Sequence, residues 1–264
     1  MTIEAPQPGH DTPRDLTRVH ALSFGQAADL YDAVRPTYPA EALTWALGDE
    51  RVTVLDVGAG TGLLTRRLIT AGHHVIATDP DKQMLEKLIA VSPGLADHRH
   101  CGAEELTLPD AHVDVVTAGQ SYHWFDPATA LPEFVRVLRP GGRFVPMWNV
   151  RDESVDWVAR LTDIVGAQSA ADVTARLAAR PGYFAPYFPS HELRVFPHRK
   201  TLTPTTLIRL IKSRSYYLTC TPDRKREMLA DIERLIAEHP ELAGRDTFEM
   251  PYLTHAYRMN PVIA

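Results

Sequence analysis

Residues 52–72 read VTVLDVGAGTGLLTRRLITAG and combine three local signals in one stretch. The β-branched apolar run at 52–57 predicts a buried strand, and Gly58, Gly60 and Gly62 predict a sharp turn directly after it. The leucines that follow have helical spacing up to the next glycine. The stretch therefore predicts a strand, a glycine-rich turn and a helix, in that order.

The same alternation continues on the C-terminal side of this stretch. Further strands are expected at 73–79, around 98–101, at 113–118 and at 143–150, and helices at 81–91 and 127–138. Strands that alternate with helices in this way form a parallel sheet with helices on both faces. The first part of the chain therefore predicts an α/β domain.

Beyond residue 151 the alternation weakens. A helix is expected at 157–167 and a strand at 192–202. Two further helices are expected to begin at Thr203-Pro204 and at Thr221-Pro222, because Thr caps a helix and Pro fits its first position.

The stretch at 248–259, FEMPYLTHAYRM, is aromatic and reads as an extended segment. Pro251 lacks the N–H that a residue of a central strand would donate to the ladder. The sequence therefore predicts an edge strand here.

The composition of the 264-residue chain is that of an ordinary globular protein. Hydrophobic residues make up 44%, charged residues 23%, and the apolar runs are shorter than the ~20 residues that a membrane helix needs. The formal charge of -5 argues against a protein built mainly to bind nucleic-acid phosphates. Cys101 and Cys220 fit neither a disulfide framework nor a CxxC metal site. We therefore expect a cytoplasmic monomer or homodimer that binds no metal, membrane or nucleic acid.

The length suits one large domain with additions. Residues 1–20 are rich in Pro, poor in apolar side chains and unlike a secretion signal, so a flexible tail is expected there. Residues 21–264 are expected to form the domain, with an N-terminal cap at 21–45 and a helical cap or substrate insertion at 167–240.

The glycine turn and a later carboxylate together predict a nucleoside ligand. The spacing is GxGxG, with Leu63 where the dinucleotide fingerprint GxGxxG has its third glycine, which disfavours a pyrophosphate. Asp79 ends the second predicted strand, where a carboxylate accepts hydrogen bonds from both ribose hydroxyls. A ribose without a pyrophosphate indicates a nucleoside such as S-adenosylmethionine. The alternative for Asp79 is to cap the next helix, which Asp81 can do equally well.

Four stretches follow one another at the spacings of a known family. They are VLDVGAGTG (54–62), the strand end TDPD (78–81), GAEELTLPDAHVDVV (102–116) and LRPGGRF (138–144). Together they resemble class I S-adenosylmethionine-dependent methyltransferases of the small-molecule type. FGQAADLYDAVRPTYP (24–39), QSYHWF (120–125) and PYLTHAYR (251–258) are similar to the methyltransferase type 11 branch that includes trans-aconitate methyltransferase-like proteins.

The resemblance implies a Rossmann-like fold: an α/β, seven-stranded, mostly parallel sheet with helices on both faces and helical cap elements. It implies S-adenosyl-L-methionine as the cofactor and S-adenosyl-L-homocysteine as the product. The glycine turn would pass beneath the amino-acid part of the cofactor, Asp79 would bind the ribose, and Gln120 would lie beside the methyl group. The implied cofactor contacts are Tyr31, Arg35, Gly58, Ala59, Gly60, Asp79, Pro80, Met84, Ala103, Glu104 and Gln120.

Two more of these residues, Arg35 and Glu104, have alternatives that the sequence leaves open. Tyr31 and Arg35 belong to a segment that would fold over the cofactor, where Arg35 would pair with the cofactor carboxylate or anchor the cap. Glu104 would meet the adenine edge or remain a solvated loop carboxylate.

Methyl transfer is an in-line displacement at an electrophilic sulfonium, so alignment and exclusion of water supply most of the catalysis. A base helps a phenol, a hydroxyl or a protonated amine, whereas an ionised carboxylate needs none. His123 is the predicted base because it follows the fourth strand, at the edge where open α/β sheets bind ligands. A structural role within its loop is the alternative.

The acceptor site is predicted from aromatic and basic residues. Between 199 and 226, eight of 28 residues are Lys or Arg and one is acidic, an excess that suits an anionic acceptor or a solvated helix face. Arg209 or Arg214 would recruit such an anion. The predicted acceptor contacts are Tyr38, Trp124, Trp148, Arg214 and Tyr217.

The sequence thus predicts methyl transfer from S-adenosylmethionine to a small-molecule acceptor on oxygen or nitrogen, such as a carboxylate or a natural-product intermediate. One alternative is a non-catalytic protein that binds S-adenosylmethionine. Another is an NAD-dependent oxidoreductase, which the glycine spacing disfavours. A nucleic-acid methyltransferase is disfavoured by the net charge.

Overall fold

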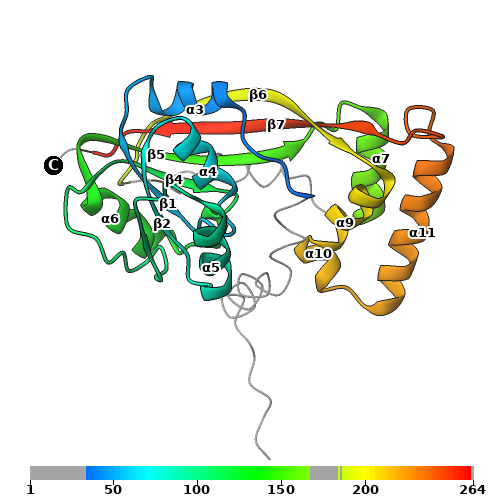
Figure 1. Ribbon diagram of the computed structural model, residues 1–264, viewed down its shortest axis with the longest axis horizontal. Coiled ribbons are helices and arrows are strands. Elements are labelled where there is room, and N and C mark those ends of the chain that lie inside the picture. The colour runs from blue at the N-terminus through cyan, green and yellow to red at the C-terminus, as the bar shows by residue number, and fades with distance from the viewer. Residues whose placement is uncertain (1–33, 167–183, 185, 263–264) are drawn as a thin grey trace, which may run out of the picture.

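The computed structural model describes residues 34–166, 184 and 186–262. The strands of this part of the chain form one seven-stranded sheet in the order β3-β2-β1-β4-β5-β7-β6 (Figure 1). The strands are β1 (Thr53–Val57), β2 (His74–Thr78), β3 (Asp97–Arg99), β4 (Val113–Gly119), β5 (Leu138–Arg151), β6 (His191–Leu202) and β7 (Phe248–Met259).

The first five strands run parallel, as predicted. Val54 in the central strand β1 pairs with Val75 on one side and with Val115 on the other. Parallel strands end at the same edge of a sheet, so the C-terminal ends of β1, β2 and β4 lie side by side. The predicted α/β fold with a mostly parallel seven-stranded sheet is confirmed.

The prediction of an edge strand at 248–259 was wrong. β7 lies between β5 and β6 and is antiparallel to both, so the edge strand on this side of the sheet is β6. The Pro251 carbonyl accepts the Asp152 N–H at 3.1 Å, and the last register pair with β5 is Arg151 with Tyr252. Pro251 therefore faces β5 where that strand ends, and its missing N–H interrupts no central ladder.

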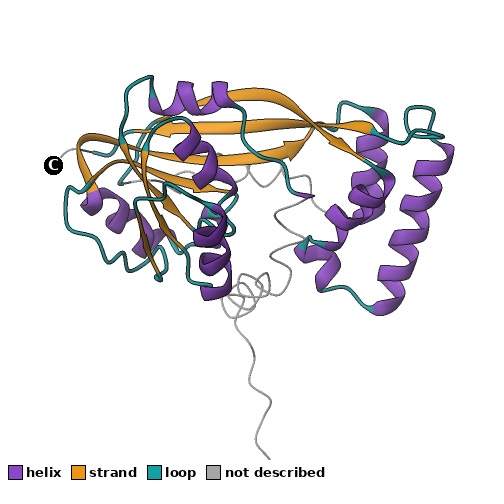
Figure 2. Ribbon diagram, in the orientation of Figure 1, coloured by secondary structure: helices purple, strands orange, loops and turns teal. Residues whose placement is uncertain are grey.

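Helices cover both faces of the sheet (Figure 2). The helices are α3 (Ala40–Leu47), α4 (Leu63–Thr70), α5 (Lys82–Val91), α6 (Pro127–Val137), α7 (Asp156–Val165), α9 (Pro204–Lys212), α10 (Ser215–Leu218) and α11 (Pro222–Glu238). Leu43 of α3 and Leu68 of α4 share one core cluster with the sheet, while Leu131 and Phe134 of α6 belong to a different cluster. The two clusters occupy opposite faces, because Val54 lies in the first and its neighbour Leu55 in the second.

Four helices gather at one end of the long strands, away from the parallel part of the sheet (Figure 1). Three of them, α7, α9 and α11, share a core cluster with the ends of β6 and β7. The predicted caps are present: Thr203 Oγ1 accepts the Thr206 N–H at 3.1 Å, and Thr221 Oγ1 accepts the Arg224 N–H at 3.3 Å. We refer to α7, α9, α10 and α11 as the helical group.

The expected tail at 1–20, the first part of the cap at 21–45 and residues 167–183 of the helical insertion lie outside the described residues. Within the described ranges, no helix has both the length and the apolar composition needed to cross a bilayer.

Candidate active site

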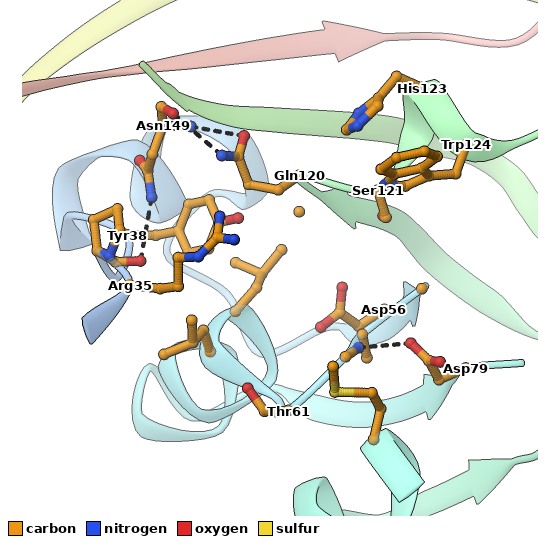
Figure 3. A pocket seen from close by; sticks show the side chains of 18 of the residues that line it. Arg35, Tyr38, Asp56, Thr61, Asp79, Gln120, Ser121, His123, Trp124 and Asn149 are labelled. Carbon is orange, nitrogen blue, oxygen red and sulfur yellow. Dashed lines mark hydrogen bonds between the residues drawn. The ribbon is translucent and has the colours of Figure 1, made fainter. Parts of the chain in front are cut away.

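A pocket lies at the C-terminal ends of β1, β2 and β4, the edge where open α/β sheets bind ligands (Figure 3). It also reaches β5 and the connection between α9 and α10. The lining residues are Arg35, Pro36, Tyr38, Asp56, Gly58, Ala59, Gly60, Thr61, Leu63, Leu64, Asp79, Pro80, Met84, Gly119, Gln120, Ser121, His123, Trp124, Phe125, Asn149 and Arg214.

The glycine turn after β1 forms one wall of this pocket. Gly58 and Gly60 have φ values of 64° and 57°, in the left-handed region that favours glycine. A Cβ built on Gly58 would lie 2.7 Å from the Cβ of Ser121, so packing also requires glycine there. A Cβ on Gly60 would meet no atom within 4 Å. Gly60 therefore presents bare backbone to open space beside the pocket.

Asp79 follows β2 and faces the turn. Its Oδ2 accepts the Gly60 N–H at 2.7 Å, and its Oδ1 accepts the Asp81 N–H at 2.8 Å (Figure 3). Asp81 is the residue that caps α5, because its Oδ1 accepts the N–H groups of Gln83 and Met84. Asp79 is thus free of the capping role, and each of its oxygens keeps acceptor capacity for a ligand.

Burial raises the pKa of two carboxyls at this wall. The pKa of Asp79 rises to about 6, against the opposing effect of its two backbone hydrogen bonds. The pKa of Asp56 also rises to about 6, although Thr65 Oγ1 at 2.6 Å and Thr117 Oγ1 at 3.1 Å donate to it. Both carboxyls are therefore mainly ionised at pH 7. Asp79 can then accept hydrogen bonds from ligand hydroxyls.

Two amide side chains form the side of the pocket away from Asp79 (Figure 3). Gln120 Nε2 donates to the Asn149 carbonyl at 3.2 Å, and the Asn149 N–H donates to Gln120 Oε1 at 3.1 Å. Asn149 Nδ2 donates to the Thr37 carbonyl at 3.0 Å. Gln120 has a φ of 58°, a strained value of the kind that gathers at functional sites. The pair fixes the end of β4 to β5 and to the segment before α3.

Arg35 and Tyr38 come from that segment. Arg35 is buried, and its guanidinium donates to Ser213 Oγ at 3.2 Å and to the Ser213 carbonyl at 2.8 Å. These bonds tie the segment to the C-terminal end of α9, while a contact of Arg35 with the cofactor stays a prediction. The Tyr38 hydroxyl lies so close to Gly119 that a Cβ on Gly119 would come within 2.7 Å of it.

His123 lies in the short 3₁₀ turn η2 (Tyr122–Trp124) that follows β4. Its side chain is exposed at the pocket and contacts the Trp124 ring, with 4.6 Å between centroids. It makes no hydrogen bond with another residue of the described ranges. The surrounding protein desolvates the ring and so lowers the pKa of His123. The imidazole is therefore neutral at pH 7 and able to accept a proton.

The structure brings most of the predicted site residues to one pocket. Those that line it are Arg35, Tyr38, Gly58, Ala59, Gly60, Asp79, Pro80, Met84, Gln120, His123, Trp124 and Arg214. Their roles toward a ligand stay predictions.

The remaining predicted residues lie elsewhere. Ala103 and Trp148 are buried in the core cluster that contains α6, and Tyr217 packs against the helical group, with Lys225 Nζ 5.5 Å from its ring centroid. Glu104 Oε1 accepts the Asp126 N–H at 3.0 Å. Tyr31 lies outside the described residues.

Sequence reasoning missed several polar residues of the pocket. Asp56, Ser121 and Asn149 line it, and each lies in or just after the C-terminal part of a strand. A polar residue at such a position inside an apolar run was the available signal. Across the described ranges, no group of three or more His, Cys, Asp or Glu side chains is placed to hold a metal ion.

The comparisons with known proteins agree with this arrangement. A methyltransferase domain model matches residues 55–145. An uncharacterized methyltransferase of Mycobacterium tuberculosis is 41% identical over 238 residues, covering 90% of this chain and 95% of its own length. An uncharacterized methyltransferase of Schizosaccharomyces pombe is 33% identical, covering 88% of this chain and 94% of its own.

Solved structures agree on the fold. One of them, named as a type II methyltransferase from Anaeromyxobacter dehalogenans, has a TM-score of 0.65 and 23% identity, and covers 87% of this chain and 98% of its own. The glycine turn, the strand order and the near full-length match to curated methyltransferases lead to one assignment. The chain belongs to the methyltransferase family.

Proposed function

We propose that this enzyme transfers a methyl group from S-adenosylmethionine to a small-molecule acceptor, on oxygen or nitrogen. One observation carries the proposal: the Asp79 carboxylate lies against bare Gly60 backbone at the pocket wall. A ribose needs a carboxylate acceptor, and the chain beneath it needs glycine to come close. The pocket offers both within one hydrogen bond of each other.

The residues present fit this cofactor. The open space at Gly60 is room that a Cβ would fill, and Gly60 has the φ that glycine tolerates. Thr61 Oγ1 is buried without a hydrogen-bond partner among the described residues, so a polar atom at this turn remains unsatisfied. Pro80 and Met84 supply an apolar surface on the Asp79 side of the pocket. We propose that Gly58, Ala59, Gly60, Asp79, Pro80, Met84 and Gln120 hold S-adenosylmethionine.

When bound, S-adenosylmethionine supplies a methyl group on an electrophilic sulfonium. The protein's part is to align the acceptor and exclude water. Gln120 and Asn149 brace one side of the pocket through their reciprocal hydrogen bonds, and Trp124 and Phe125 contribute aromatic surface to another. His123, neutral at pH 7, would accept the proton of a hydroxyl or amine acceptor.

A product-mass experiment tests the proposal. The protein is incubated with S-adenosylmethionine that carries a deuterated methyl group and with a panel of carboxylates, phenols and amines. We expect one panel member to gain the mass of one labelled methyl, and the gain to diminish in an Asp79→Asn variant. If S-adenosylhomocysteine binds but no product forms, the non-catalytic alternative is favoured. If NADH binds instead, the oxidoreductase alternative is favoured. The proposal includes a cytoplasmic location and a monomeric or homodimeric state.

A further inference from the structure

A band of polar side chains continues from the pocket along the sheet toward the helical group. Asn149 lines the pocket, and Arg151 lies two residues further along β5, so both side chains are on the same face. Arg151 pairs with Tyr252 in β7, which pairs in turn with His198 in β6. Directly opposed residues share a face, so these three form one row beside Asn149.

The row is packed and mostly covered. The rings of His198 and Tyr252 stack with 5.5 Å between centroids, and His198 Nε2 lies 3.2 Å from Asn149 Oδ1. Tyr252 is fully buried, with a relative exposure of 0%. The row therefore joins the pocket wall directly to the base of the helical group, where Tyr252 also belongs to the core cluster.

Two arginines of this region have side chains without a partner in the part of the chain that the structure describes. Arg214, in the connection between α9 and α10, lines the pocket. The guanidinium groups of Arg214 and Arg151 make no hydrogen bond or ion pair with any residue that the structure describes. Arg35 differs, since it is hydrogen-bonded to Ser213. Two half-buried guanidinium groups thus have donors that no described residue satisfies, and such donors are suited to a charged ligand group.

Two tyrosine hydroxyls beside them are also unsatisfied. The hydroxyls of Tyr252 and of Tyr216 in α10 are buried and have no hydrogen-bond partner among the described residues. Tyr252 is the register partner of Arg151 on the same face of the sheet. Burial raises the pKa of Tyr252, and the positive charges of Arg214, Arg151 and Arg35 oppose that rise. A buried hydroxyl without a partner costs free energy, so two of them together indicate a site for a polar ligand group.

We propose that Arg151, Arg214 and the hydroxyls of Tyr252 and Tyr216 bind an oxyanion of the methyl acceptor, a carboxylate or a phosphate. The inference rests on the proposed function and names the substrate class: an anion whose charged group is held at the helical group while its methyl-accepting atom lies in the pocket. The arginine forks match oxyanion geometry, and the two hydroxyls donate to the same group.

Calorimetric titration tests the site with two probes, succinate and inorganic phosphate, on protein saturated with S-adenosylhomocysteine. We expect saturable binding of at least one probe, and the preferred probe tells a carboxylate site from a phosphate site. Arg151→Gln and Arg214→Gln should each weaken that binding by about tenfold or more, as the loss of charged hydrogen bonds predicts. Tyr252→Phe and Tyr216→Phe should weaken it by about three- to tenfold.

Arg209→Gln is the matched control, because Arg209 is an exposed arginine of α9 that does not line the pocket. It should leave probe binding unchanged. The inference is overturned if neither probe binds, or if Arg209→Gln weakens probe binding as much as Arg214→Gln. It is also overturned if Arg214→Gln lowers the affinity for S-adenosylhomocysteine instead of the affinity for the probe. The last result would assign Arg214 to the cofactor site instead of the acceptor site. Failure of S-adenosylhomocysteine to bind at all would count against the proposed function, while titrating the probes into the protein alone would still test the oxyanion site.

Discussion

Asp79 carries the proposed contact with the ribose, and its substitution gives the sharpest test at the scale of one residue. Asp79→Asn keeps the shape of the side chain but removes the charge. Loss of charge-assisted hydrogen bonds of about 1.5–3 kcal/mol should weaken S-adenosylhomocysteine binding by about tenfold or more. Calorimetric titration measures the change, with Glu86→Gln on the exposed face of α5 as the charge-matched control. Equal affinities for the two variants would remove Asp79 from the site.

The raised pKa of Asp79 adds a pH dependence to the same contact. The carboxyl is ionised above about pH 6 and protonated below it. Protonation removes the acceptor charge, so the affinity for S-adenosylhomocysteine should fall as the pH decreases through about 6. The Asp79→Asn variant has no such proton to gain, so its affinity should change less over that range. Any change that remains is assigned to other groups of the pocket, such as Asp56, whose pKa is also about 6. A wild-type affinity that does not change across this window would show that Asp79 is not in contact with the cofactor.

His123 links the chemistry to the kind of acceptor. With a hydroxyl or amine acceptor, His123→Ala should lower kcat by about 10²–10⁴-fold while the affinity for S-adenosylhomocysteine stays the same. With a carboxylate the loss should be small and appear mainly in KM.

The pH–rate profile of the wild type checks the assignment. Because desolvation lowers the pKa of His123, the acidic limb should lie below the ordinary histidine value of about 6.5. That limb should be absent in the variant. A limb that persists in His123→Ala assigns the proton to another group and leaves His123 as part of the pocket wall.

Among the elements, the glycine turn allows an effect on stability to be distinguished from an effect on ligand affinity. Gly60→Ala places a methyl group in the open space of the pocket, at a position with positive φ. It should reduce S-adenosylhomocysteine affinity by about tenfold or more through steric exclusion, with a stability loss of about 1–2 kcal/mol from the backbone.

Gly141→Ala provides the control for backbone strain. Gly141 also has a positive φ, and a Cβ there would meet nothing within 4 Å, but it does not line the pocket. It should lose similar stability by thermal unfolding and keep its affinity. If both variants lose affinity to the same extent, the effect at Gly60 is general strain rather than contact with the ligand.

The elements differ in how far the sequence could predict them. The segments β1, α4, β2 and α5 could be predicted closely. Their signals are the spacing of apolar residues, the turn glycines and the helix-capping residues, and each of these determines local structure within a few residues. The position of β7 within the sheet could not be predicted. Pro251 removes only one N–H from the strand, and the two neighbouring strands are distant in sequence. The Gln120–Asn149 pair depends on a register between β4 and β5 in the same way.

Residue choice within β5 shows a related difficulty. Neighbouring residues of a strand face opposite sides, so either Trp148 or Asn149 can face the pocket, but not both. The sequence favoured the aromatic residue. The structure places Asn149 at the pocket and Trp148 in the core on the other face. Arg214 and Arg209 were indistinguishable by charge alone, and only the packing of α9 places Arg214 at the pocket.

In the whole molecule, two parts of the chain are proposed to hold one acceptor between them. The parallel part of the sheet supplies the proposed cofactor site, and the helical group with the ends of β5, β6 and β7 supplies the oxyanion site. Arg35 connects the two through Ser213, and Lys200 Nζ donates to the Arg35 carbonyl at 3.1 Å. The two proposed binding sites are therefore connected by hydrogen bonds through Arg35.

The proposed methyl transfer requires that the pocket between Asp79 and Gln120 binds S-adenosylmethionine. Calorimetric titration of S-adenosylhomocysteine into the wild-type protein tests it most directly, with NADH titrated in parallel. We expect saturable binding of one S-adenosylhomocysteine per chain and no heat of binding with NADH. No binding of S-adenosylhomocysteine by the folded protein, or tighter binding of NADH, would contradict it.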